Sequence, residues 1–231
     1  MKAIAIIPAR GGSKRIPRKN IKDFFGKPLI AYSIEIALKS GLFERVIVST
    51  DDAEIAKVAI SYGAEVPFFR PATLSDDFSG TAEVVANVLQ ELAKYGETYE
   101  YVCTLYATAP LLQLEYLRKG YEALKNSDAV HSFSATSMPS PIQRSFKITQ
   151  DGRAQMFTPE FYFSRSQDLE EAYCDAGAFY WSKNGVKSDE ILFSKESIPI
   201  VLPRYLVQDI DTQEDWIMAE IMFEAVQKRV S

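Results

Sequence analysis

The residues best suited to chemistry follow the first apolar run of the chain. Residues 3–7 (AIAII) are typical of a strand buried on both faces, and two adjacent glycines, Gly11 and Gly12, come soon after it. Glycine lets a backbone approach a ligand, successive amides form an anion-binding concavity, and fixed cations hold phosphates. This pattern predicts a polyphosphate site, although a solvated basic loop is the alternative that the residues alone leave open. The stretch carries five cations within ten residues: Arg10, Lys14, Arg15, Arg18 and Lys19.

Two common phosphate-binding motifs do not match this stretch. A Walker A loop requires G-x-x-x-x-G-K-[ST], whereas here the glycines are adjacent and Ser13 precedes Lys14. A dinucleotide fingerprint requires G-x-G-x-x-G, which the stretch does not contain. The residues therefore predict a polyphosphate ligand, but they do not match either of these known phosphate-binding loops.

A pair of carboxylates near the other end of the chain is the second candidate. Asp209 and Asp211 are two positions apart, so in an extended segment both side chains point to the same side. Two carboxylates aimed at one point repel each other unless a cation lies between them. Mg²⁺ suits such a pair, because it is usually bound by one or two carboxylates together with substrate phosphates. The alternative is a helix start with Thr212 as the cap, and both roles can coexist.

These two stretches resemble motifs of a known family. Residues 8–21 (PARGGSKRIPRKNI) resemble the first motif of the CMP-sialic acid synthetases, which activate nine-carbon 2-keto sugar acids with CTP. Residues 208–212 (QDIDT) resemble the metal-binding motif of the same enzymes. The resemblance runs over nearly the whole chain, with both motifs in the family's order.

The resemblance implies roles for individual residues. Arg10, Lys19 and Asp211 would be catalytic, and Asp209 with Asp211 would hold Mg²⁺. From the sequence alone, Arg70 could equally be a cation of a surface loop. The residues implied to bind the nucleotide are Ala9, Arg10, Gly11, Ser13, Lys14, Lys19, Asn20, Arg70 and Thr81.

On the sugar side the resemblance implies Tyr106, Arg165 and Asp175. Where sialic acid enzymes read L-Q-P-T-S-P-L-R, residues 105–112 read LYATAPLL, and Asp175 stands where those enzymes carry asparagine. These departures resemble the branch that uses pseudaminic acid, so the expected reaction makes CMP-pseudaminic acid and pyrophosphate. The alternatives are the same reaction with legionaminic acid, N-acetylneuraminic acid or Kdo, or a non-catalytic nucleotide-binding module.

The elements expected around these residues alternate between strand and helix. Helices are predicted at residues 28–39, 53–62, 81–94, 115–125 and 214–230. The first begins at a proline, and glycines follow the ends of the first two. Strands are expected at residues 3–7, 45–49, 65–69, 101–105, 129–134, 176–181 and 198–202. Short strand–helix repeats build mostly parallel sheets by right-handed crossovers. The sequence predicts one α/β nucleotidyltransferase domain over residues 1–231, a Rossmann-like three-layer α/β/α fold.

The alternation breaks between residues 135 and 170. Pro139 and Pro141 mark turns, and Asp151-Gly152 between short alternating runs predicts a hairpin. An aromatic cluster at Phe157 and residues 161–163 predicts core packing or a subunit contact, with a cofactor site as the less favoured alternative. In the resembling family this insertion reaches a second subunit, which implies a homodimer.

Composition narrows the possible partners. The 231 residues carry a net charge of −5, which does not suggest a nucleic-acid partner. No apolar run approaches the ~20 residues of a membrane span, and no signal peptide is apparent, so we expect a cytoplasmic protein without a membrane partner. Two cysteines are expected to be reduced, and the one histidine, His131, makes a Ser-His-Asp triad improbable.

Overall fold

A six-stranded sheet forms the centre of the protein in this computed structural model, which describes residues 2–75, 80–185 and 192–230. The strand order is β10-β6-β9-β5-β1-β4, and only β9 runs against its neighbours, with which it pairs in antiparallel register. The expected mostly parallel sheet is therefore confirmed. Its strands are β1 (Ala3–Pro8), β4 (Arg45–Ser49), β5 (Tyr101–Leu105), β6 (His131–Ser137), β9 (Tyr173–Lys183) and β10 (Ser197–Val201).

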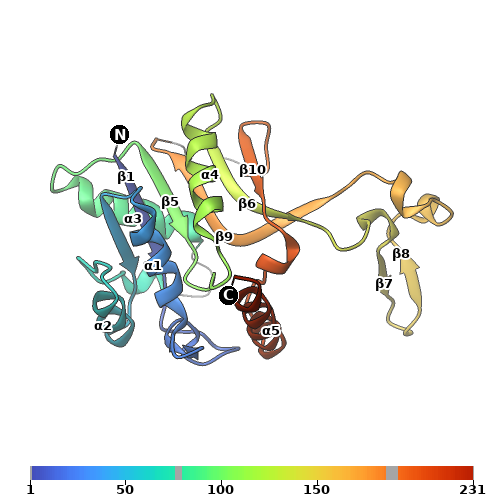
Figure 1. Ribbon diagram of the computed structural model, residues 1–231, viewed down its shortest axis with the longest axis horizontal. Coiled ribbons are helices and arrows are strands. Elements are labelled where there is room, and N and C mark those ends of the chain that lie inside the picture. Colours follow the sequence, from blue (N-terminus) through green and yellow to red (C-terminus); the bar gives the residue numbers. More distant parts are fainter. Residues whose placement is uncertain (1, 76–79, 186–191, 231) are drawn as a thin grey trace.

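Helices cover both faces of this sheet and complete three layers (Figure 1). Alternate residues of β1 point to opposite faces: Ala5 and Ile7 pack with α1 and α4, whereas Ile4 and Ile6 pack with α3. Both Ile4 and Ile6 are fully buried, and burying such a side chain contributes ~1.5–3 kcal/mol. The helices are α1 (Leu29–Ser40), α2 (Ala53–Ser61), α3 (Thr81–Ala93), α4 (Leu114–Lys125) and α5 (Gln213–Val230).

One expected strand, at residues 65–69, is wrong. Glu65 makes only an isolated parallel bridge to Ile47, with its amide donating to the Val46 carbonyl. Pro67 follows two residues later and has no amide with which to continue a ladder. The chain therefore leaves the sheet after one bridge and runs on to Arg70.

The segment between β6 and β9 projects from the body as an arm (Figure 1). The expected hairpin is confirmed: β7 (Phe146–Ile148) pairs with β8 (Ala154–Met156), and Gly152 in its turn has a φ of 78°. The aromatic cluster was expected either in a core or in a subunit contact. Phe163 is 93% exposed, Phe157 and Tyr162 are also exposed, and Phe161 is half-buried, so the structure excludes core packing for the three exposed side chains. A second short hairpin, β2 (Asp23–Phe24) with β3 (Lys27–Pro28), leads into α1.

Two smaller observations complete the fold. Cys103 is buried in β5 and Cys174 is exposed in β9, and both are free thiols. No helix in residues 2–75, 80–185 and 192–230 has the length and apolar character needed to cross a membrane.

Candidate active site

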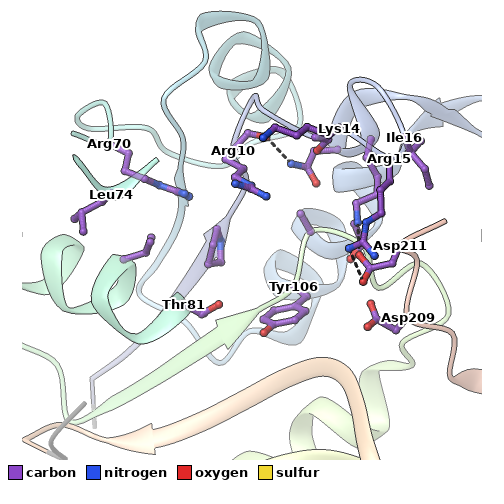
Figure 2. Close-up of a pocket in the computed structure, with 17 residues that line it drawn as sticks. Arg10, Lys14, Arg15, Ile16, Arg70, Leu74, Thr81, Tyr106, Asp209 and Asp211 are labelled. Atoms are coloured by element: carbon purple, nitrogen blue, oxygen red, sulfur yellow. Dashed lines mark hydrogen bonds and ion pairs between the residues drawn. The ribbon is translucent and has the colours of Figure 1, made fainter. Parts of the chain in front are cut away.

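A cavity of about 390 Å³ opens at the carboxyl ends of β1 and β5 (Figure 2). Ligands bind at this edge in open α/β sheets, so its position agrees with the sequence-based expectation. Ten of the predicted residues line it: Arg10, Ser13, Lys14, Lys19, Asn20, Arg70, Thr81, Tyr106, Asp209 and Asp211.

Hydrogen bonds at both ends hold the basic loop that follows β1. The Ala9 amide donates to the Ser49 carbonyl at 2.9 Å and so continues the ladder between β1 and β4. The buried Asn20 side chain donates to the Arg10 carbonyl at 3.1 Å and closes the loop on itself. Neither Ala9 nor Gly11 lines the cavity. Ala9 is buried, and the Gly11 amide donates to Asp51 Oδ1 at 2.9 Å.

The acidic segment near the end of the chain meets this loop directly. Lys19 Nζ donates to the Ile210 carbonyl and lies 3.2 Å from Asp211 Oδ1, while Arg15 lies 2.9 Å from Asp211 Oδ2. Beneath these charges, the buried side chains of Ile16 and Ile210 belong to one apolar cluster with Trp216 of α5. Apolar packing and ion pairing therefore bring the two predicted motifs to one place.

Asp215 gives the acidic segment its shape. Its Oδ2 accepts from the amides of Asp211 and Thr212, at 3.1 and 2.7 Å. The hydrogen bond from the Thr212 hydroxyl is the largest cause of the lowered pKa of Asp215, and the bonds from the two amides add to it. The Thr212 hydroxyl accepts in turn from the Asp215 amide, so Thr212 begins α5 as the alternative interpretation expected. The helix start and the two carboxylates that line the cavity therefore coexist.

Asp209 occupies an unfavourable place for a negative charge. Withdrawal from solvent among the cavity walls, followed by repulsion from Asp211, raises the pKa of Asp209. A cation beside both carboxylates would relieve that repulsion. In the described parts of the chain no group of three or more His, Cys, Asp or Glu side chains could hold a metal, so Mg²⁺ here would need phosphate or water oxygens as well.

Arg70 belongs to the wall of the cavity rather than to a surface loop. It is 7% exposed, and its guanidinium donates to the Ser49 hydroxyl at 3.2 Å and the Ser49 carbonyl at 2.5 Å. Burial lowers the pKa of Arg70. An arginine guanidinium is nevertheless not deprotonated in proteins, so the side chain stays charged. A buried cation at the cavity suits an anionic ligand.

A second recess, of about 500 Å³, adjoins the first and shares Thr81 and Tyr106 with it. It is lined mainly by α3, β5 and β9, and Asp175 lies in its wall. The Tyr180 hydroxyl donates to Asp175 Oδ2 at 2.6 Å, and the Tyr180 ring lies 5.1 Å from that of Tyr106. Arg165 is exposed in the arm and lines neither cavity.

Arg15 and Tyr180 are among the residues at the site that the sequence did not indicate. Arg15 is one of the five cations of the basic loop, and its pairing with Asp211 depends on a contact between distant segments of the chain. Tyr180 lies in an expected strand, but the strand pattern does not say which neighbours it meets. In both cases the signal lay in residue type, and tertiary structure decided the partner.

Comparison with known proteins identifies the family. A family model described as Cytidylyltransferase matches residues 4–200. The chain belongs to this family. It is therefore a nucleotidyltransferase, as the sequence predicted, and the alternative of a non-catalytic nucleotide-binding module is set aside.

Three similar proteins cover almost the whole cytidylyltransferase chain. A pseudaminic acid cytidylyltransferase from Campylobacter jejuni subsp. jejuni serotype O:2 is 50% identical over 226 residues, or 97% of each chain. A CMP-N,N'-diacetyllegionaminic acid synthase from Legionella pneumophila is 34% identical over 99% of each chain. The structure of CMP:2-keto-3-deoxy-manno-octonic acid synthetase complexed with CTP matches with a TM-score of 0.71 and 16% identity, covering 99% of this chain and 100% of that one. This structural likeness confirms the Rossmann-like fold.

The geometry of the basic loop predicts different effects for its two glycines. A Cβ on Gly11 would lie 2.8 Å from Asp52 Oδ2 and 3.0 Å from Asp52 Cβ, whereas a Cβ on Gly12 meets nothing within 4 Å. We expect Gly11→Ala to shift the loop and weaken CTP binding by about tenfold, the loss of roughly one charge-assisted hydrogen bond. Gly12→Ala is the matched control and should bind CTP within about twofold of wild type. Calorimetric titration of both variants with CTP measures the difference, and equal affinities would contradict this geometry.

Proposed function

We propose that this cytidylyltransferase couples CTP to pseudaminic acid and releases pyrophosphate. Convergence of the basic loop and the Asp209–Asp211 pair on one cavity is the observation that supports a nucleoside triphosphate, and the match to the cytidylyltransferase family supports CTP. The 50% identity to the Campylobacter relative, over 97% of both chains, supports the sugar acid. As the sequence leads us to expect, the proposed place of action is the cytoplasm.

The reaction joins the anomeric 2-hydroxyl of the sugar acid to the α-phosphate of CTP. The bond from the α-phosphorus to its bridging oxygen breaks, the hydroxyl proton is released, and pyrophosphate leaves. Phosphoryl-group chemistry of this kind depends on positioning and on stabilising negative charge. Arg10 and Lys19 are proposed to carry that task, with Lys14, Ser13 and Asn20 orienting the triphosphate from the same loop.

The cavity wall divides the remaining tasks. Arg70 and Thr81 are proposed to face the nucleoside, with the backbone at Ala9 and Gly11 setting the path of the loop. Asp209 and Asp211 are proposed to hold Mg²⁺, since their donor set suits it and the raised pKa of Asp209 reflects a charge that a cation would stabilise. A bound Mg²⁺ supplies charge neutralisation at the phosphates.

Tyr106 and Asp175 are proposed to read the sugar. Tyr106 lines both the first cavity and the second recess, whereas Asp175 lines the second recess alone. Tyr180 links the two residues, because its hydroxyl donates to Asp175 and its ring packs against that of Tyr106. Asp175 Oδ1 accepts from the Gly177 amide at 2.9 Å and Asp175 Oδ2 accepts from Tyr180, so the carboxylate has a defined direction. An oriented acceptor favours a sugar that places a hydroxyl or amide N–H opposite it, and it rejects a sugar without a donor at that position.

Residues 135–170 are proposed to form a dimerisation insertion within a single domain. The arm exposes apolar side chains at Phe146, Ile148, Phe157, Tyr162 and Phe163, a pattern that marks interaction surfaces. Arg165 lies beside this group and lines neither of the two cavities described above. Its proposed contact with the sugar carboxylate therefore requires the cavity of a second copy.

A pyrophosphate-release assay over a panel of nucleotides and sugar acids tests the proposed reaction. We expect turnover with CTP and pseudaminic acid, and at least ~100-fold less with UTP, because a site fitted to one base leaves buried groups unpaired with another. Legionaminic acid, N-acetylneuraminic acid and Kdo should be poorer substrates.

Tyr106→Gln with Asp175→Asn should lower kcat/KM for pseudaminic acid by at least ~10-fold with little change in melting temperature. Equal use of UTP would contradict the choice of nucleotide, and an unchanged sugar preference would leave Tyr106 a packing residue.

The metal proposal predicts a linked change in activity and stability. Asp211→Asn keeps the shape of the side chain but removes the charge, so we expect a loss of at least ~100-fold in turnover with the fold intact. In thermal melts, the wild type should gain a CTP-dependent shift that grows when Mg²⁺ is added, as expected for ligands that bind only the folded state. Asp211→Asn should lose the Mg²⁺-dependent part. Near-normal turnover of this variant at limiting Mg²⁺ would leave Asp211 with its helix-start contacts alone.

The arm predicts a dimer whose activity depends on apolar contact. Phe163→Glu places a charge in the proposed interface, and burying an unpaired charge costs several kcal/mol. We expect light scattering to show a dimer for the wild type and a monomer of low activity for this variant. Tyr95→Glu, which alters an aromatic residue that is 80% exposed elsewhere on the chain, should remain dimeric and active. A fully active wild-type monomer would contradict the proposal.

A further inference from the structure

Arg18 stands apart from the other cations of the basic loop. It does not line the cavity, and its backbone has φ 56° and ψ 29°, the left-handed conformation. Non-glycine residues seldom adopt this conformation unless their surroundings fix it. In the described parts of the chain, Phe25 is the other non-glycine residue with a positive φ.

The side chain of Arg18 supplies the contacts that fix it. Its Nη1 lies 2.5 Å from Asp52 Oδ2, and its Nη2 lies 2.9 Å from Asp52 Oδ1 and 2.5 Å from Glu54 Oε2. The pairing with Asp52 is bidentate, the geometry in which arginine binds carboxylates most specifically. Arg18 is the largest cause that lowers the pKa of Asp52 to about 2, so this carboxylate is ionised at any working pH.

Asp52 is itself held rigidly. Its Oδ1 accepts from the amides of Glu54 and Ile55, both at 3.0 Å, and so caps the first turn of α2. Its neighbour Asp51 accepts from the Gly11 amide, and the missing Cβ of Gly11 leaves the room that Asp52 occupies. Both the beginning and the end of the basic loop therefore rest on the two aspartates that follow β4.

The next residue, Lys19, reaches in the other direction. It donates to the Ile210 carbonyl and pairs with Asp211, so consecutive residues connect α2 with the acidic segment. A shift of the backbone at Arg18 would move Lys19 with it. The position of a proposed phosphate-binding cation is thus coupled to a contact made outside the cavity.

We propose that Arg18 is a positioning residue for nucleotide binding, acting through Asp52 to fix the backbone from which Lys19 reaches the triphosphate. The inference rests on the proposed use of CTP. Arg18 has no contact with the nucleotide in this role. Its pairing with the first turn of α2 sets where the catalytic end of the loop lies.

Arg18→Ala tests the role against a matched control. Arg45 also bridges two carboxylates, with Nη2 2.7 Å from Glu65 Oε2 and Nη1 2.7 Å from Glu97 Oε2, but it lies at the opposite end of β4. We expect Arg18→Ala to raise the Kd and KM for CTP by about tenfold while KM for the sugar acid stays within about twofold. Arg45→Ala should lower the melting temperature by about as much as Arg18→Ala does, but it should leave the Kd for CTP unchanged.

A second variant separates positioning from charge. Asp52→Asn keeps a good helix cap but removes the charge that Arg18 binds. If Arg18 positions Lys19 through Asp52, this variant weakens CTP binding, and the double variant Arg18→Ala/Asp52→Asn binds no more weakly than Arg18→Ala alone. If Arg18 acts directly on the triphosphate, Asp52→Asn frees the cation and strengthens binding, which would overturn the proposal.

The remaining outcomes are also decisive. Arg18→Ala with wild-type Kd and KM for CTP would overturn the positioning role, as would an equal rise in Kd for Arg45→Ala. A wild-type enzyme that binds a different nucleotide and not CTP would instead overturn the proposed function. Direct calorimetry on the wild type with CTP, UTP and ATP distinguishes that failure from the first.

Discussion

The contact of Lys19 with Asp211 joins residues 192 positions apart in the chain, and the rest of the site depends on it. Each of the two segments carries like charges that repel one another. The basic loop holds several cations, and the acidic segment places two carboxylates side by side. Brought together, each offsets the repulsion within the other. The sheet makes this possible, because β1 lies inside it and delivers the basic loop to the edge where α5 begins.

Apolar packing makes the same contact from below. Ile16 and Ile210 are buried together with Phe24, Leu29 and Trp216, so both charged segments rise from one hydrophobic cluster. Hydrophobic contact is indifferent to direction, whereas the charges above it are oriented by Asp52, Asn20 and Asp215. The apolar cluster thus holds the two segments together, and the hydrogen bonds above it determine where each charged side chain points.

Local patterns made most elements of the fold predictable. The strands at β1, β4 and β5 and all five long helices follow from burial periodicity and capping residues such as Asp52. The strand expected at residues 65–69 failed because one missing amide, at Pro67, outweighed an apolar pattern. At the site, residue types indicated Arg10, Lys19 and Asp211, but not that Asp51 accepts from Gly11 or that Arg15 meets Asp211. Those pairings depend on strand order and on the path of α5, neither of which is encoded within a short window.

The place where the arm leaves the sheet has a consequence for how such enzymes diverge. β6 and β9 are adjacent antiparallel strands, so the arm is an enlarged hairpin connection rather than a crossover. Residues can be gained, lost or exchanged there without altering strand order or the parallel strands that carry the basic loop. The ends of β6 and β9 also carry Asp175 and lead to Arg165, on the side proposed for the sugar. Changes at this connection can therefore alter which sugar acid is accepted, while the strands that carry the basic loop stay as they are.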